Sequence, residues 1–212
     1  MTTMTKNPAA KQPAIQPPRS GFQPIPTRIR DTRDGQIPPL VVQPAAAQEK
    51  AMVEQSLAEL GTKLAEIHRI AAEAYLSQGS YGQALPHLES AATFAPTEVE
   101  FRLQLGFVRY VTGDDVGAID AYNAVIAQEP KNGEAWYSLG MVQFGQNQFA
   151  GAEECFRRAG EIHPDDAQVW NNRGVCLWQM SRLTEACKCF EQALRIDPND
   201  TDAKFNLAQV NC

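Results

Sequence analysis

The chain has 212 residues, of which 43% are hydrophobic, and its formal net charge is −6. It has no apolar run long enough to cross a membrane, and its first residues lack the apolar stretch of a secretory signal. Its five cysteines lack the spacing of a small disulfide-bonded domain, which favours a reducing compartment and predicts a cytoplasmic protein.

The charge is unevenly distributed along the chain. Residues 1–48 carry six Lys or Arg against two Asp, a charge of +4, so the remainder carries −10 to give the total of −6. An acidic helical body repels a phosphate backbone. We therefore expect no nucleic acid among the partners.

Residues 1–46 are predicted to form a disordered, basic, proline-rich tail. Nine of the 14 prolines lie in residues 1–48, and proline removes backbone donors that a helix or sheet needs. Residues 22–26 (FQPIP) and 37–42 (IPPLVV) are short apolar segments that favour the extended polyproline conformation. The tail is either a solvated linker or a ligand for a groove, in this chain or in a partner.

Residues 47–64 are predicted to form an N-terminal helix that continues to about residue 78. Its apolar residues follow one another at alternating steps of four and three, as in a coiled-coil seam: Val53, Leu57, Leu60, Leu64, Ile67, Ala71 and Ala74. Gly61 is a position where this helix could break. Two roles remain open, because residues 47–63 could pack on the first repeat as a cap or pair with a second copy in a homodimer.

Seven residues recur after 34 positions. Trp136, Leu139, Gly140, Ala152, Phe156, Ala159 and Pro164 are followed by Trp170, Arg173, Gly174, Ala186, Phe190, Ala193 and Pro198. This pattern resembles the tetratricopeptide repeat family. The resemblance implies an all-α solenoid of helical hairpins with repeats at 65–98, 99–132, 133–166 and 167–200, closed by a capping helix at 201–212.

The repeat also predicts how the two helices of each hairpin meet. Small residues should let the two helices approach closely: Gly106, Gly140 and Gly174 on the first helix and Ala84, Ala118, Ala152 and Ala186 on the second. Large residues are expected to fill the space between the helices: Leu105 with Tyr122, Leu139 with Phe156 and Trp170 with Phe190. Turns are expected at Gly79, Gly113, Asn147 and Ser181, and helix N-caps at Asn132, Asp166 and Asp200. Two residues depart from the pattern: Pro86 fits only in the first turn of its helix, and Arg173 stands where Leu is usual.

The family resemblance implies a peptide-binding concave face lined by the first helix of each repeat. The residues that it assigns to peptide binding are Leu103, Phe107, Tyr110, Tyr137, Met141, Phe144, Asn171, Val175 and Trp178. These positions lack the Lys, Asn and Arg clamp with which co-chaperones of the family hold a carboxylate. We therefore expect an apolar groove for an extended segment, rimmed by Glu100 and Glu134, with at least half of its residues exposed.

No enzymatic site or cofactor is predicted. The three histidines occupy unrelated repeat positions. Cys187 and Cys189 are two residues apart on a helix and so point to different sides, which prevents them from sharing a metal ion. Cys155 and Cys189 are expected to lie too far apart for a disulfide.

Two functions fit these expectations. Residues 101–122 and 140–159 are similar to the middle repeats of type III secretion chaperones, which implies a cytoplasmic chaperone for a hydrophobic translocator. The alternative is a structural scaffold or adaptor subunit anchored in a larger complex by its N-terminal tail. In either case the expected partner is a protein, without insertion into a membrane.

Overall fold

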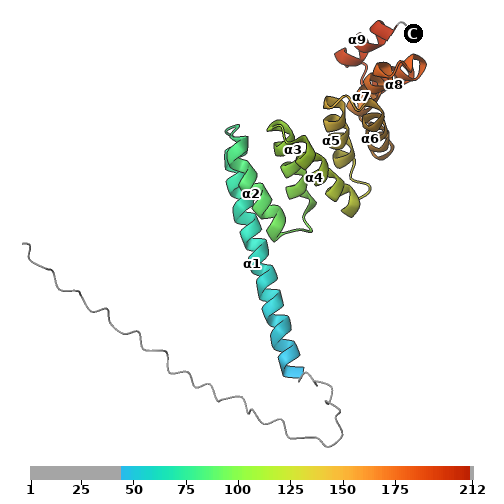
Figure 1. Cartoon of the computed structure of the whole chain (residues 1–212). Coiled ribbons are helices and arrows are strands. Elements are labelled where there is room, and N and C mark those ends of the chain that lie inside the picture. The colour runs from blue at the N-terminus through green and yellow to red at the C-terminus, as the bar shows by residue number, and fades with distance from the viewer. Residues whose placement is uncertain (1–43, 211–212) are drawn as a thin grey trace, which may run out of the picture. The chain divides into compact units, whose positions relative to one another are not determined.

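The computed structural model of this chain describes residues 44–210. Residues 1–43 of the tail predicted for residues 1–46 lie outside them, and residues 44–46 are helical instead. All regular structure in the described part is helical, which confirms the expected all-α fold (Figure 1). The helices are α1 (Pro44–Leu76), α2 (Tyr81–Phe94), α3 (Val99–Val111), α4 (Asp115–Gln128), α5 (Gly133–Gly145), α6 (Phe149–Ile162), α7 (Ala167–Gln179), α8 (Leu183–Ile196) and α9 (Thr201–Val210).

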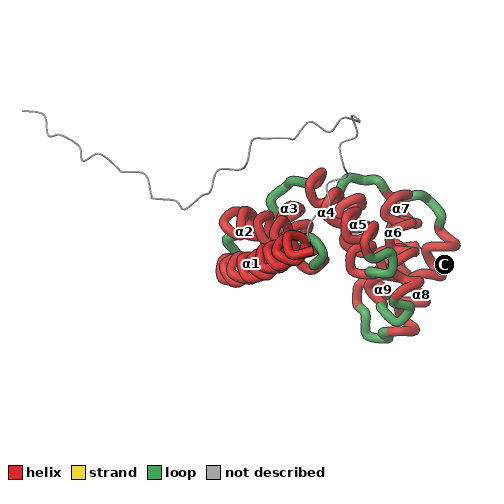
Figure 2. Tube along the Cα trace, turned by 90° about the horizontal axis from the view of Figure 1, so that it is seen from below, coloured by secondary structure: helices red, strands yellow, loops and turns green. Residues whose placement is uncertain are grey.

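The helices form four consecutive hairpins, and each helix packs mainly on its neighbours in sequence (Figure 2). The helices α3, α5 and α7 begin at Val99, Gly133 and Ala167, each 34 residues after the last. The closing helix α9 packs on α8 and α7. The 34-residue period of the sequence is therefore the period of the structure.

The predicted close approach of the second helix at the glycines of the first is confirmed in three hairpins, where each glycine lies against an aromatic ring. The pairs are Gly106 with Tyr122, Gly140 with Phe156 and Gly174 with Phe190. A Cβ atom built at these glycines would lie 2.6, 2.9 and 2.6 Å from the nearest ring carbon. Only the absence of a side chain lets the aromatic ring come this close to the first helix.

The four turns predicted from the repeat are also confirmed. Gly79, Gly113, Asn147 and Ser181 all have a positive φ, between 60° and 86°. Two of the predicted N-caps accept a backbone hydrogen bond, Asn132 from Ala135 and Asp166 from Gln168. Asp200 does the same for Asp202 and Ala203 at the start of α9. Left-handed turn residues therefore recur between the two helices of each hairpin, and side-chain caps recur where α5, α7 and α9 begin.

In the first hairpin, the expectation for Pro86 is wrong, and two points that the sequence left open are decided. The helix α1 does not break at Gly61, where a Cβ atom would lie 3.2 Å from the Phe94 carbonyl oxygen. A side chain there would therefore crowd the C-terminal end of α2. Pro86 lies inside α2 beyond its first turn. Residues 47–60 are all exposed, so within the described part of the chain they do not cap the first repeat.

The two tryptophans and Arg173 explain how neighbouring repeats are joined. The Trp136 and Trp170 indole N–H groups donate to the carbonyl oxygens of Pro130 and Pro164 at 2.9 and 3.0 Å. Arg173 donates to Glu153 of α6 at 2.7 Å, and its guanidinium lies 5.8 Å from the Trp170 ring. The position where Leu is usual is therefore occupied by an ion pair that packs on an aromatic ring.

Candidate functional site

The first helices of the repeats, α3, α5 and α7, carry the residues that the sequence assigns to peptide binding. Phe107 is exposed, and Tyr110, Tyr137, Met141, Phe144, Val175 and Trp178 are half-buried. Leu103 and Asn171 are buried, with 6% and 9% of their surface exposed. Leu103 belongs to the core around Tyr122, so it is not available to a ligand.

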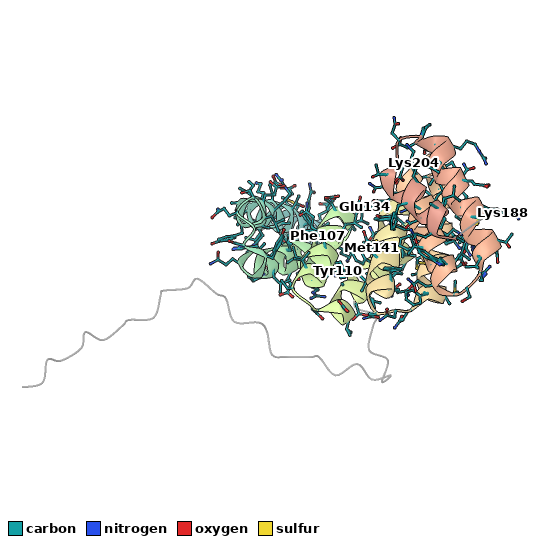
Figure 3. All side chains as sticks on the ribbon, turned by 90° about the horizontal axis from the view of Figure 1, so that it is seen from above. Phe107, Tyr110, Glu134, Met141, Lys188 and Lys204 are labelled. Carbon is teal, nitrogen blue, oxygen red and sulfur yellow. The ribbon has the colours of Figure 1, made fainter. Side chains whose placement is uncertain are left out.

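The α3 part of this face is aromatic. Phe107 is 47% exposed and meets Tyr81 edge to face, with ring centroids 6.1 Å apart. The Tyr110 hydroxyl lies at the end of α5, 3.6 Å from where a Cβ atom of Gly145 would be. Figure 3 shows Phe107 and Tyr110 on α3 and Met141 on the neighbouring α5, whereas Lys188 lies at the outer edge of the C-terminal repeats. The aromatic surface therefore continues from α3 to α5.

A hydrogen bond joins α5 to α7 at the centre of the face. The Asn172 amide donates to the Tyr137 hydroxyl at 3.0 Å, and the same nitrogen lies 3.7 Å from the Met141 sulfur. The Tyr137 ring also packs on Phe156, with centroids 5.6 Å apart. Burial raises the pKa of the Tyr137 hydroxyl, and the hydrogen bond from Asn172 opposes this rise. The phenol stays protonated at neutral pH and keeps an O–H donor for a ligand.

An open cavity of about 510 Å³ lies between α5, α7 and the start of α9. It is lined by Tyr137, Met141, Ala167, Gln168, Asn171, Asn172, Asp197, Asn199, Asp200, Thr201 and Asp202. Amides, hydroxyls and carboxylates outnumber apolar groups in this set. The face is therefore aromatic over α3 and α5 but polar over α7, which the apolar prediction missed.

A second open cavity, of about 710 Å³, adjoins the first and shares Tyr137, Gln168 and Asp197 with it. Six carboxylates line the two cavities: Glu134, Asp165, Asp166, Asp197, Asp200 and Asp202. Among the described residues that line them, His163 is the one group that can carry a positive charge. The polar half of the face is therefore anionic, and it suits a cationic ligand.

The closing helix α9 completes this end of the face. The Asn206 side-chain amide donates to the side-chain oxygen Oδ1 of Asn171 at 2.9 Å. Asn171 and Asn206 are 35 residues apart, as are Tyr137 and Asn172. Each of these hydrogen bonds thus joins the first helices of adjacent repeats through residues that are 35 positions apart, one more than the repeat length. This spacing is a sequence signal that could have identified Asn172 as a site residue.

The described residues contain no cluster of three or more His, Cys, Asp or Glu suited to a metal ion. No helix in this part of the chain is long and apolar enough to span a membrane. Cys155, Cys176 and Cys189 are buried free thiols. Burial raises the pKa of Cys155 and Cys176 to about 12, so neither is a nucleophile at neutral pH.

Comparisons with known protein families support the repeat architecture. A tetratricopeptide repeat model matches residues 113–173, and a second such model matches residues 167–200. A search of curated protein sequences gave no match to this chain.

Several solved structures are similar to this one. MamA from Desulfovibrio magneticus RS-1 has a TM-score of 0.67 and 22% identity, covering 70% of this chain and 84% of that chain. The pilF protein of Pseudomonas aeruginosa has a TM-score of 0.63 and 20% identity, covering 71% and 68%. The first TPR of Spaghetti (RPAP3), bound to the HSP90 peptide SRMEEVD, has a TM-score of 0.52 and 23% identity, covering 53% and 90%. What these chains share with this one is the fold.

Proposed function

We propose that this chain, which carries tetratricopeptide repeats in residues 113–200, is a non-catalytic module that binds an extended segment of another protein. The binding surface is the face of α3, α5 and α7. The observation that carries the proposal is the continuity of this face, where aromatic side chains lead into a carboxylate-lined cavity of about 510 Å³. An extended peptide can use both halves because its side chains alternate along the backbone.

The aromatic half supplies contact area. Phe107 of α3 is 47% exposed. Tyr110 of α3 and Met141 and Phe144 of α5 are half-buried. A small cavity of about 60 Å³ opens between Met141, Phe144 and Val175. Aromatic and thioether side chains of this kind act as anchors at protein interfaces because they bury a large surface with few rotatable bonds. One apolar side chain of the ligand is expected at each of these places.

The polar half supplies hydrogen bonds and charge. The extended backbone of a bound peptide has unpaired N–H and C=O groups, and side-chain amides such as Asn172 and Gln168 can pair with both. The six carboxylates around the two cavities select against an acidic ligand. The peptide SRMEEVD held by the Spaghetti repeat ends in acidic residues, and we propose the opposite charge preference for this chain.

Two roles share this binding chemistry. A chaperone of secretion type would use the face to hold an apolar segment of its client before delivery. An adaptor subunit would instead be anchored through its N-terminal tail and present the same face inside a complex. The exposed Phe107 of α3 favours the chaperone role, because a chaperone must capture an apolar segment from solution.

The test is capture of client proteins on the immobilised full chain, read by mass spectrometry. Phe107→Lys should reduce recovery of the specific clients by about tenfold or more, because it places a charge in the aromatic half. Leu183→Lys is the matched control, since Leu183 of α8 is 46% exposed against 47% for Phe107. It should leave capture unchanged. Equal recovery with both variants contradicts a binding site on this face.

The same assay separates the two roles. A chain that lacks residues 1–43 retains all of α1 to α9 and should keep its client if it is a chaperone. Loss of every partner on this deletion, with Phe107→Lys still active, would support the anchored adaptor instead.

A further inference from the structure

The binding face leaves one large apolar surface unused, on α1. Seven large apolar residues of this helix are exposed: Met52 (69%), Val53 (59%), Leu57 (62%), Leu60 (61%), Leu64 (37%), Ile67 (61%) and Ile70 (55%). They make up more than half of the exposed large apolar residues in the described part of the chain. Isolated residues of this kind are ordinary at a protein surface, but a run along one helix indicates an interface.

The contact between α1 and α2 does not use these residues. Ala65 and Ala72 are 1% and 0% exposed, and Gly61 lies where α2 comes closest. In Figure 1 the helix α2 lies beside the second half of α1, and the first half extends beyond it. The helix α1 therefore packs within its hairpin through these small residues together with His68, Tyr75 and Leu76, and the seven large apolar residues named above stay exposed.

The spacing of the large residues identifies the kind of partner. Val53, Leu57, Leu60, Leu64 and Ile67 follow at steps of four, three, four and three, and the now continuous α1 places all five on one seam. Such a seam packs best against another helix with the same period, because each residue enters a space between four residues of the partner. None of the helices α2 to α9 offers an exposed seam of this kind. The matching helix is α1 itself.

Charge and area are consistent with a second copy. The helix α1 carries three Lys or Arg and five Glu, and several are paired within the helix, such as Lys50 with Glu54 at 3.6 Å. Like charges therefore do not dominate its flanks. If each of the seven exposed residues buries about 60–80 Å², two copies bury roughly 1,000 Å², near the lower bound for a specific interface.

We propose that α1 pairs with α1 of a second copy through Val53, Leu57, Leu60, Leu64 and Ile67, so that the chain is a homodimer. The pairing is separate from the face of α3, α5 and α7. A dimer therefore carries two peptide-binding faces, and a client with two suitable segments gains avidity without any new contact.

Sedimentation equilibrium of the full chain tests the pairing, at about 1 to 100 µM because a dimer depends on concentration. The unaltered chain should sediment as a dimer. The variant Leu57→Lys with Leu60→Lys should raise the dissociation constant by about a hundredfold or more, since each dimer then loses four buried leucines. Circular dichroism should be unchanged, because both side chains are more than 60% exposed. The control Val116→Lys, at a residue of α4 that is 70% exposed, should remain a dimer.

A charge-exchange experiment then asks whether the two seams meet each other. Leu57→Glu with Leu60→Glu should also be monomeric, and an equal mixture of the lysine and glutamate variants should associate as a heterodimer. The proposal is overturned by an unaltered chain that is monomeric at the highest concentration, by a lysine variant that stays dimeric, or by a mixture that stays monomeric.

Discussion

The α7–α8 and α1–α2 hairpins meet at equivalent positions with different residues. In α7–α8, Gly174 faces Phe190, which is 0% exposed. Three repeat lengths earlier, Ala72 and Leu88 occupy these positions, and both are also 0% exposed. A glycine with an aromatic ring and an alanine with a leucine fill the same space in different ways. At this point the hairpin therefore requires a certain combined side-chain volume of the two facing residues rather than particular residues.

The two hairpins differ more in what surrounds that contact. The start of the second helix is not one of these differences, because neither Ser80 before α2 nor Arg182 before α8 makes a side-chain cap. At the α1–α2 contact, the Nδ1 atoms of His68 and His87 lie 3.0 Å apart, so one ring donates to the other. The first hairpin has one neighbouring hairpin, α3–α4, whereas α7–α8 lies between α6 and α9. The stability of the α1–α2 hairpin therefore depends more on the partner that covers the exposed seam of α1.

The largest effect is expected from emptying the aromatic position of α7–α8. Phe190→Ala should lower the free energy of unfolding by about 3–5 kcal/mol, because it leaves a cavity beside Gly174. Urea denaturation followed by circular dichroism measures this loss. Protection of backbone amides from hydrogen exchange should weaken first in α7, α8 and α9, since each repeat contacts only its neighbours. A loss below about 1 kcal/mol would mean that the neighbouring helices collapse into the space.

A smaller effect is expected from adding one methyl group on the facing side. Gly174→Ala should lower the free energy of unfolding by about 1–3 kcal/mol, because its Cβ atom would lie 2.6 Å from a Phe190 ring carbon. Gly82→Ala in α2 is the control, since a Cβ atom there meets nothing within 4 Å. It should be neutral or stabilise by up to about 1 kcal/mol. Two changes of the same sign and size would contradict the close packing of α7 on α8.

The repeat made most of the fold predictable from the sequence. The turn residues Gly79, Gly113, Asn147 and Ser181 lie at the loops where they were expected, because each needs a left-handed backbone that follows directly from its place in the repeat. The close approach of the second helix at Gly140 was predictable for the same reason. These are contacts within one hairpin, and the sequence pattern encodes them locally.

The binding face was less predictable because it depends on contacts between repeats. Leu103, Tyr137 and Asn171 occupy the same repeat position, yet Leu103 is buried in the core, Tyr137 is half-buried and Asn171 lies under α9. The rotation of each helix on its neighbour decides which of them reaches the surface. The fate of residues 47–60 was open for a related reason, since a heptad pattern does not say which helix covers it.

The smallest effect on stability is expected at Arg173, which departs from the repeat pattern and whose contacts explain the departure. Arg173 and Glu153 form an ion pair at 2.7 Å with side chains 22% and 12% exposed. Arg173→Leu restores the usual residue but leaves the Glu153 carboxylate largely buried without its partner, so we expect a loss of about 1–2 kcal/mol in the free energy of unfolding. The double variant with Glu153→Leu should recover most of this loss, because two apolar side chains replace the pair. Thermal or urea unfolding of both variants measures the difference, and a single variant as stable as the unaltered chain would show that solvent already satisfies Glu153. In that case packing alone would stabilise both the α1–α2 and the α7–α8 hairpins. The ion pair would then contribute only to the specificity of contacts between repeats.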